Sequence, residues 1–385
     1  MSEKREIPFG RPDISDVDRQ AVMRVMEGHI LTHGPECKAF ETDFSAFLGE
    51  GAHSVTVSSC MAALHMAFLH LGLGEGDEVI APALTHVAAV HAIEWVRARP
   101  VFVDPEPATG NITAERIAAT LTPKTKAISL VHFVGIPCEM DAIMALAEER
   151  GLKVVEDCAI AVGARWKGRH VGLFGHSGTF SFYPVKHMTT GEGGMFISRH
   201  PEVVQAISKL RAFGVDRTHA ERSIPGLYEV PSLGLNYRMS EMQAALGRTQ
   251  TARLESTLGK RRDNFAALKK GLEGIAGIRI LDAKTRDATN SHYCLVMALE
   301  GPLGARRNEV VAALNAAGVG TSVYYPQPVP RMKYYREKYG YDAARYPVAT
   351  EISDRSIALP VGQHLGLSEM QYVAENVRAV LETQR

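Results

Sequence analysis

Short apolar runs alternate with helical patterns from about residue 50 to residue 200. This alternation limits the fold more than any other feature, because strands that alternate with helices form a parallel sheet with right-handed crossovers. Runs such as Ala127–Val131 are apolar on both faces, which is typical of a sheet covered on both sides. We therefore predict an α/β fold. The predicted strands are Ser54–Val57, Glu78–Ala81, Pro100–Val103, Ala127–Val131 and Leu152–Glu156, and the predicted helices between them are Met61–Leu71, Ala114–Leu121 and Met140–Arg150.

The pattern changes near residue 240. Ser240 with Gln243 has the spacing of a capping box, and a long helical pattern follows it to about Leu272. The rest of the chain indicates a smaller α+β domain, so we predict a large α/β domain at residues 1–245 and a small domain at 246–385. The predicted elements of the small domain are strands Gly277–Leu281, Tyr293–Leu299 and Thr321–Tyr325, and helices Arg307–Ala317 and Ser368–Thr383.

Composition excludes several classes of function. The 385 residues include 43 basic and 43 acidic side chains, which argues against binding to nucleic acid or to an anionic membrane surface. No stretch reaches the roughly 18 consecutive apolar residues of a membrane span, and the charged start has no apolar leader region behind it. The five cysteines are widely spaced and form no CxxC. We therefore expect buried, reduced thiols, no metal site and a cytoplasmic protein.

One candidate for chemistry is the end of a buried strand, Gly151-Leu-Lys-Val-Val-Glu-Asp157. Ligands of open α/β sheets bind beyond the carboxyl ends of the strands, where Asp157 is placed to hold a positive group. An alternative is that Asp157 caps the segment that follows. This segment alone favours neither interpretation.

A second candidate is Lys186. A strand is predicted to end at Pro184, and the residues after the lysine are small, polar and rich in glycine, so backbone there can approach a ligand closely. A lysine is a nucleophile only when neutral, and forming a Schiff base with an aldehyde cofactor uses this property. The alternative is a solvated lysine after an edge strand.

A third candidate is Val55-Thr-Val-Ser-Ser-Cys60-Met61, where a strand leads directly into a helix. The unpaired N–H groups and the positive dipole end of a helix start suit a phosphate. Ordinary capping by serine requires the same geometry.

Taken together, these segments resemble the DegT/StrS family of sugar aminotransferases, which are pyridoxal-phosphate enzymes of fold type I. The resemblance covers nearly the whole chain. The matching segments are Ile30–Pro35, Gly76–Pro82, Pro100–Asp104, Thr122–Ala127, Val131–Gly135, Glu156–Asp157, Phe180–Lys186, Glu192–Gly194 and Gly234–Met239.

The resemblance implies roles for single residues. Lys186 resembles the Schiff-base lysine, which is also the acid and base of the proton shift. Asp157 resembles the partner of the pyridine nitrogen, and Ser181 resembles the serine that binds the cofactor phosphate. The family's Gly-Thr at the helix start is Cys60-Met61 here, so that backbone N–H groups remain for the phosphate but the threonine hydroxyl does not.

Further roles follow from the same resemblance. His86 occupies the position of an aromatic ring on the pyridine face, and Asn236 resembles the residue that reaches the phosphate from the partner subunit. The resemblance therefore implies a homodimer with shared active sites. Three residues past Asp157, where the family usually carries Gln or His, this chain has Ile160.

The substrate side is the least determined. The candidate substrate-binding residues are His33, Arg238, Tyr324 and Tyr325, and a structural ion pair is an equal alternative for Arg238. The resemblance implies transfer of an amino group from L-glutamate or L-glutamine to a keto sugar that is linked to a nucleotide. Alternatives that keep the fold are a sugar dehydratase, a cyclitol aminotransferase of the inosose type, and a non-catalytic sensor. The family's dehydratase branch has histidine in place of the lysine, and Lys186 argues against it.

Overall fold

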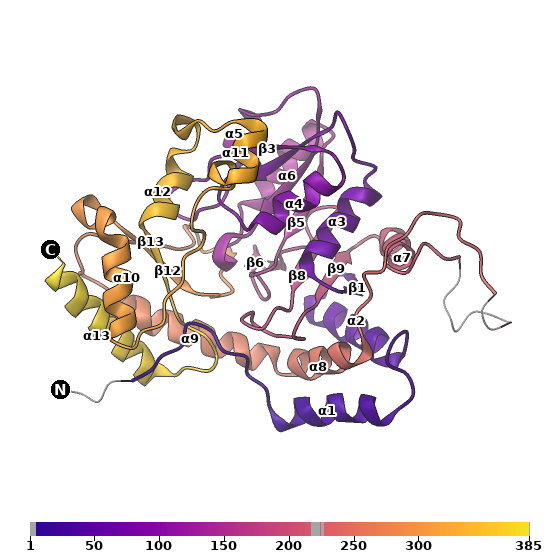
Figure 1. The fold of residues 1–385 in the computed structure, drawn as a ribbon, viewed down its shortest axis with the longest axis horizontal. Coiled ribbons are helices and arrows are strands. Elements are labelled where there is room, and N and C mark those ends of the chain that lie inside the picture. Colours follow the sequence, from indigo (N-terminus) through magenta and orange to yellow (C-terminus); the bar gives the residue numbers. More distant parts are fainter. Residues whose placement is uncertain (1–4, 217–223, 225–226, 385) are drawn as a thin grey trace.

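A sheet of seven strands forms the centre of the protein in the computed structural model, which describes residues 5–216, 224 and 227–384 (Figure 1). The strand order is β1-β9-β8-β5-β4-β2-β3. β9 is antiparallel to its neighbours β1 and β8, and the other neighbouring pairs are parallel. The strands are β1 (His53–Val57), β2 (Glu78–Pro82), β3 (Arg99–Val103), β4 (Thr125–Val131), β5 (Lys153–Asp157), β8 (Ser177–Ser181) and β9 (Gly194–Ser198).

Helices cover both faces of this sheet, which explains why its strands are apolar on both sides. α3 (Cys60–His70), α4 (Val87–Trp95) and α7 (Pro201–Leu210) share one hydrophobic core with Val155 of β5. α6 (Met140–Glu149) packs on the other face with Val154. The five predicted strands are confirmed to within two residues at each end. The helix predicted at Ala114–Leu121 is shorter, because α5 ends at Ala118.

The long helix predicted after residue 240 is two helices. α8 (Glu241–Ala252) begins with the predicted capping box, in which Ser240 and Gln243 bind each other's backbone N–H groups. The helix stops at Arg253, and α9 (Leu254–Gly271) continues from there. Figure 1 shows the two helices one after the other along the lower side of the molecule, with α8 beside α1 (Asp16–Glu27) and α9 beside α13 (Leu367–Thr383).

A second sheet has the order β10 (Ile278–Leu281), β12 (Leu295–Leu299) and β13 (Ser356–Leu359). It shares a core with α9, α13 and α10 (Arg307–Ala316), as the predicted α+β unit requires. Ile7 packs into this core and pairs with Val319, so the first described residues lie with the C-terminal part of the chain. The domain boundary between residues 245 and 246 stays a prediction.

The strand predicted at Thr321–Tyr325 is wrong. Only Ser322 forms a bridge, with Ala358 of β13, and β13 itself supplies the third strand. Tyr325 makes aromatic contacts with His86 and Phe133 of the large unit, and Tyr324 contacts Tyr293, so the chain leaves the sheet there.

Several findings complete the description of the fold. Among the described residues, no helix is both long enough and apolar enough to cross a membrane. All five cysteines are free and buried, as predicted. Further elements are α2 (Pro35–Leu48), α11 (Lys333–Tyr339), α12 (Pro347–Arg355) and a small sheet of β11 (Ala288–Thr289), β6 (Arg165–Trp166) and β7 (Arg169–His170).

Candidate active site

Asp157 is the last residue of β5, at the carboxyl end of the central strands. Its Oδ1 accepts hydrogen bonds from the Ala159 N–H at 2.9 Å and from the Cys60 thiol at 3.9 Å. Its Oδ2 accepts no hydrogen bond from any residue that the structure describes. Burial raises the pKa of the Asp157 carboxyl, and the Ala159 amide and the charges of Lys186 and His132 partly oppose this rise. A cation that approached Oδ2 would favour the ionised form further.

Lys186 lies in the loop after β8, which ends at Ser181 and not at the predicted Pro184. Its Nζ lies 5.1 Å from the ring centroid of Tyr293. Burial lowers the pKa of Lys186, and the nearby Cys60, Asp157 and Cys294 oppose this fall. Lys186 and Asp157 each oppose the pKa shift of the other, so the two charges lie close enough to interact. The two residues that carry most of the predicted chemistry are therefore brought together.

The start of α3 closes the same site. Ser59 caps the helix and accepts the Ala62 N–H at 3.1 Å. The N–H groups of Cys60 and Met61 donate to none of the described residues, so they remain available to an anion. Gly194 packs directly behind them, because a Cβ there would lie 2.5 Å from the Ser59 carbonyl carbon and 2.6 Å from the Cys60 nitrogen.

Ser181 lies beside this helix start, because it pairs with Gly194 in the sheet. Its Oγ accepts the Tyr183 N–H at 3.4 Å. Within the described part of the chain its hydroxyl hydrogen has no acceptor. A phosphate at the start of α3 would therefore meet two free amides and one free hydroxyl donor.

Aromatic side chains lie near the amine of Lys186, and we call this group the aromatic wall; its members are His86, Phe133, Tyr293, Tyr324 and Tyr325. His86 caps α4, and its Nδ1 accepts the Ala88 N–H at 3.2 Å. Its ring lies 5.7 Å from that of Tyr325, which also approaches Phe133 at 6.3 Å. Burial lowers the pKa of His86, and Lys186 adds to this effect. The Tyr324 and Tyr293 hydroxyls are 2.8 Å apart.

Three predicted residues make no contact with Lys186 or Asp157 among the described residues. Asn236 is exposed and forms a bridge with Ala212, and the next residue, Tyr237, accepts the Ser58 N–H at 2.8 Å beside the start of α3. His33 and Arg238 line a cleft of about 710 Å³ beside β1 and α7, and the described lining of that cleft includes neither Lys186 nor Asp157. The roles predicted for these three residues stay predictions.

Sequence reasoning missed Tyr293 and Thr179. Tyr293 is buried and comes from the chain before β12, and Thr179 Oγ1 lies 3.5 Å from the Cys60 sulfur. Neither belongs to a motif, so only the folded arrangement identifies them. Ile160 is buried, and because its side chain is aliphatic it gives the site no hydrogen bond. Its backbone carbonyl accepts the Ser291 hydroxyl.

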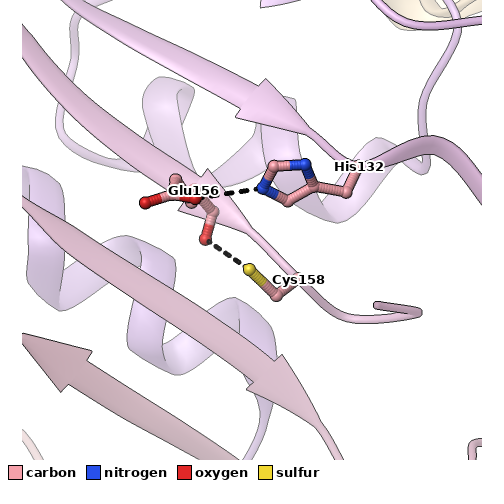
Figure 2. A group of neighbouring side chains, drawn as sticks. All are labelled: His132, Glu156 and Cys158. Atoms are coloured by element: carbon pink, nitrogen blue, oxygen red, sulfur yellow. Dashed lines mark hydrogen bonds and ion pairs between the residues drawn. The ribbon is translucent and has the colours of Figure 1, made fainter. Parts of the chain in front are cut away.

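A cluster of donors lies next to Asp157. The ligand atoms of His132, Glu156 and Cys158 are all within 4.8 Å of one another (Figure 2). Each group is already engaged. His132 Nδ1 accepts the Cys138 N–H at 3.1 Å, its Nε2 faces Glu156 Oε2 at 3.1 Å, and the Cys158 thiol donates to the Glu156 carbonyl at 3.8 Å. A metal would need lone pairs that these hydrogen bonds occupy, so we interpret the cluster as structural.

The site fits pyridoxal phosphate. Lys186 supplies a buried amine for the aldehyde, Oδ2 of Asp157 supplies an open acceptor for a protonated ring nitrogen, and the α3 start with Ser181 supplies phosphate donors. These three requirements are separate, and one group of neighbouring residues meets all of them.

Comparisons with known proteins agree with this geometry. A sequence model of the DegT/DnrJ/EryC1/StrS aminotransferase family matches residues 12–378. The spore coat polysaccharide biosynthesis protein SpsC of Bacillus subtilis is 36% identical over 99% of both chains. Spr1654 from Streptococcus pneumoniae, a proposed sugar aminotransferase, superimposes with a TM-score of 0.92 at 28% identity, covering 98% of this chain and 99% of its own.

Spr1654 is also known in its apo and PLP forms, besides the PMP form. The aminotransferase TlmJ from Streptoalloteichus hindustanus gives a TM-score of 0.89 at 32% identity, covering 98% of this chain and 99% of its own. The predicted fold, cofactor and enzyme class are thus confirmed. The chain belongs to the DegT/DnrJ/EryC1/StrS aminotransferase family and is a pyridoxal-phosphate-dependent aminotransferase.

Proposed function

We propose that this enzyme moves an amino group from L-glutamate or L-glutamine to a keto sugar, and that the sugar is linked to a nucleotide. The observation that carries the proposal is that Lys186, Asp157 and the start of α3 are neighbours in one site, with the aromatic pair His86 and Tyr325 beside Lys186. The names of SpsC and Spr1654, which refer to a polysaccharide and to a sugar, support the acceptor class.

Each residue has a defined role in this proposal. Lys186 would hold the cofactor and would carry the proton between the carbon of the amino donor and the carbon of the cofactor, and its lowered pKa favours the neutral amine that attacks the aldehyde and takes up that proton. Asp157 would keep the ring nitrogen protonated. The bound cofactor would supply an electron sink, which Asp157 would strengthen through its charge. His86 would contact the ring, and Ser181 with the amides of Cys60 and Met61 would bind the phosphate.

Tyr324 and Tyr325 are proposed to contact the sugar. Both belong to the aromatic wall that faces Lys186, and tyrosine offers a sugar an apolar face together with a hydroxyl. His33 and Arg238 stay candidates for the carboxylate or phosphate of a substrate. Because their cleft lies apart from Lys186 in one chain, this role requires a second chain.

The proposed assembly is a homodimer with shared sites, in the cytoplasm. Asn236 is exposed in the single chain, and the segment before it exposes Leu227, Val230 and Leu233, the last with 93% of its surface accessible. Apolar side chains gathered on one exposed segment are typical of a surface that another chain covers. The five free, buried cysteines support a reducing compartment.

The first test is the amino-donor half of the reaction. Holoenzyme is mixed with L-glutamate, L-glutamine or L-lysine, and the visible band of the cofactor is followed together with the release of the keto acid. We expect the band to be lost with glutamate or glutamine and to persist with L-lysine. A band that persists with every amino donor would refute the transaminase proposal and favour a sensor.

The second test is a panel of acceptors. Enzyme charged with the donor is offered keto sugars with and without a nucleotide, and an inosose as the cyclitol. Recovery of the visible band with the nucleotide-linked sugar supports the proposal. Recovery only with inosose identifies a cyclitol aminotransferase, and loss of water from the sugar without consumption of donor identifies a dehydratase.

A further inference from the structure

Glu156 and Asp157 are adjacent on β5, so their side chains point to opposite faces of the sheet. Val155, on the Asp157 side, belongs to the core that contains Cys60 of α3. Val154, on the Glu156 side, packs with α6. Asp157 therefore faces the pocket of Lys186, while Glu156 lies beneath the same strand end, fully buried.

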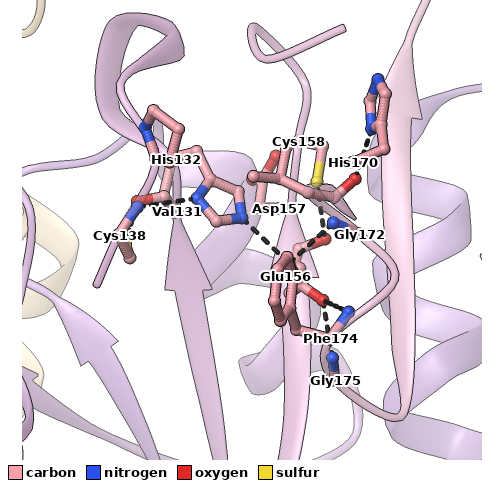
Figure 3. Close-up of polar contacts among 12 residues, drawn as sticks. Val131, His132, Cys138, Glu156, Asp157, Cys158, His170, Gly172, Phe174 and Gly175 are labelled. Carbon is pink, nitrogen blue, oxygen red and sulfur yellow. Dashed lines mark hydrogen bonds and ion pairs between the residues drawn. The ribbon is translucent and has the colours of Figure 1, made fainter. Parts of the chain in front are cut away.

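The Glu156 carboxylate has four donors (Figure 3). Its Oε2 accepts the Gly172 N–H at 2.7 Å, and its Oε1 accepts the N–H groups of Phe174 at 2.8 Å and Gly175 at 2.7 Å. The fourth donor is His132, 3.1 Å from Oε2. Because His132 Nδ1 accepts the Cys138 N–H, the proton of the neutral ring lies on Nε2 and points at Glu156.

These bonds join three segments around Asp157. His132 follows β4, Glu156 belongs to β5, and the loop 172–175 precedes β8. The backbone of Asp157 is held on the β4 side, where the His132 N–H donates to the Asp157 carbonyl at 3.2 Å. On the other side the Cys158 N–H donates to the Thr179 carbonyl of β8 at 2.8 Å. The spacing of the strands that flank Asp157 therefore depends on Glu156 and His132.

We propose that His132 and Glu156 form a positioning pair, which aligns the Asp157 carboxylate with the ring nitrogen of the cofactor from the opposite face of the sheet. The pair touches neither substrate nor cofactor in this proposal. The inference rests on the proposed role of Asp157. Its consequence is that damage to the pair changes how the cofactor is held, beyond any change in the stability of the fold.

The experiment compares three variants of the pair with one control variant. Glu156→Gln places an amide N–H against backbone N–H groups, and His132→Phe removes both hydrogen bonds of the ring. His132→Gln keeps one acceptor and one donor and is the conservative rescue. Asp18→Asn is the matched control, because Asp18 is also fully buried with four donors, Ser15, Thr249, Gln250 and Arg253, on the α1–α8 side of the molecule.

Each variant is freed of cofactor and titrated with pyridoxal phosphate, and the dissociation constant, the visible circular dichroism of the bound cofactor and Tm are measured. We expect Glu156→Gln and His132→Phe to weaken binding at least tenfold and to change the dichroism. His132→Gln should stay within about threefold of wild type, and Asp18→Asn should lower Tm while leaving binding unchanged.

Two results would overturn the inference. One is that Glu156→Gln and His132→Phe fold and bind the cofactor with the wild-type constant and dichroism. The other is that Asp18→Asn weakens binding as much as they do, which would mean that stability alone is responsible. Asp157→Asn separates the two proposals. If Asp157→Asn binds the cofactor like wild type, the proposed role of Asp157 is refuted. If Asp157→Asn weakens binding while Glu156→Gln and His132→Phe bind like wild type, only the positioning role is refuted.

Discussion

At the scale of single residues, Lys186 owes its chemistry to burial, which lowers its pKa and favours the neutral, nucleophilic amine. Lys186→Ala should abolish the visible band of the bound cofactor and lower turnover by about 10²–10⁴-fold or more, since positioned proton transfer is lost. Absorption spectra and donor turnover check this, with Lys186→Arg as a control that keeps the charge but cannot form the covalent bond. A band that survives in Lys186→Ala would move the attachment point elsewhere.

His170 makes stability depend on pH. It is fully buried, its Nδ1 donates to the Val171 carbonyl at 2.7 Å, and its Nε2 accepts the Gly163 N–H at 2.9 Å. Burial lowers the pKa of His170 to about 3. Between the unfolded value of about 6.5 and that value, only the unfolded chain binds the proton. The contribution of the neutral His170 ring to the free energy of unfolding is therefore complete above pH 6.5 and is lost as pH falls toward 3.

At pH 4.5, two pH units below the pKa of histidine in the unfolded chain, the loss in the free energy of unfolding is about 2–3 kcal/mol. Urea unfolding at pH 7.5 and pH 4.5 measures it, with His170→Gln for comparison, because the amide can make both hydrogen bonds but does not titrate. We expect the free energy of unfolding of wild type to fall by about 2 kcal/mol more than that of the variant. Equal losses in both proteins would show that other groups govern the acid sensitivity.

At the scale of elements, α8 and α9 show what a local pattern can predict. The capping box at Ser240 is a four-residue signal, and it is present. The break at Arg253 depends on distant partners, because this side chain forms an ion pair with Asp18 at 2.8 Å and binds Ser15 at 2.8 Å. No spacing within the helix indicates those contacts.

Ser240→Ala removes the cap of α8 and should lower the free energy of unfolding by about 1 kcal/mol. Chemical unfolding at neutral pH measures the change. Ser368→Ala is the control, because Ser368 lies exposed in the first turn of α13, where Gly366 is the capping residue. If both variants lose the same amount, the effect is not due to capping.

Local sequence patterns predict some residues of the site and miss those that distant segments contribute. Asp157 is the last residue of β5, and Lys186 lies in the loop after β8. A correct assignment of the strands therefore already predicts that both residues lie at one edge of the sheet. Tyr293 reaches Lys186 from the second unit, and Tyr325 reaches His86 the same way. The strand predicted at Thr321–Tyr325 is wrong for the same reason. The sequence pattern of this segment does not distinguish residues that contact the other unit from residues of a sheet.

At the scale of the whole molecule, the role predicted for Asn236 depends on a second chain. Asn236 is exposed, bridged to Ala212, at the end of a segment with exposed apolar side chains. A symmetric dimer would let each chain lend this residue to its partner. Asn236→Ala should then weaken cofactor binding roughly tenfold or more, since a hydrogen bond to a charged phosphate is lost.

Hybrid dimers test whether the site is shared. In a dimer of one Lys186→Ala chain and one Asn236→Ala chain, one site lacks both residues and the other has both intact. Random exchange makes about half of the dimers hybrid, so about one quarter of wild-type activity should return at limiting cofactor. Mass spectrometry of intact dimers confirms the exchange, and each variant mixed with itself is the control. If hybrids form and no activity returns, Asn236 does not serve the partner's site, and the proposal of shared active sites fails with it.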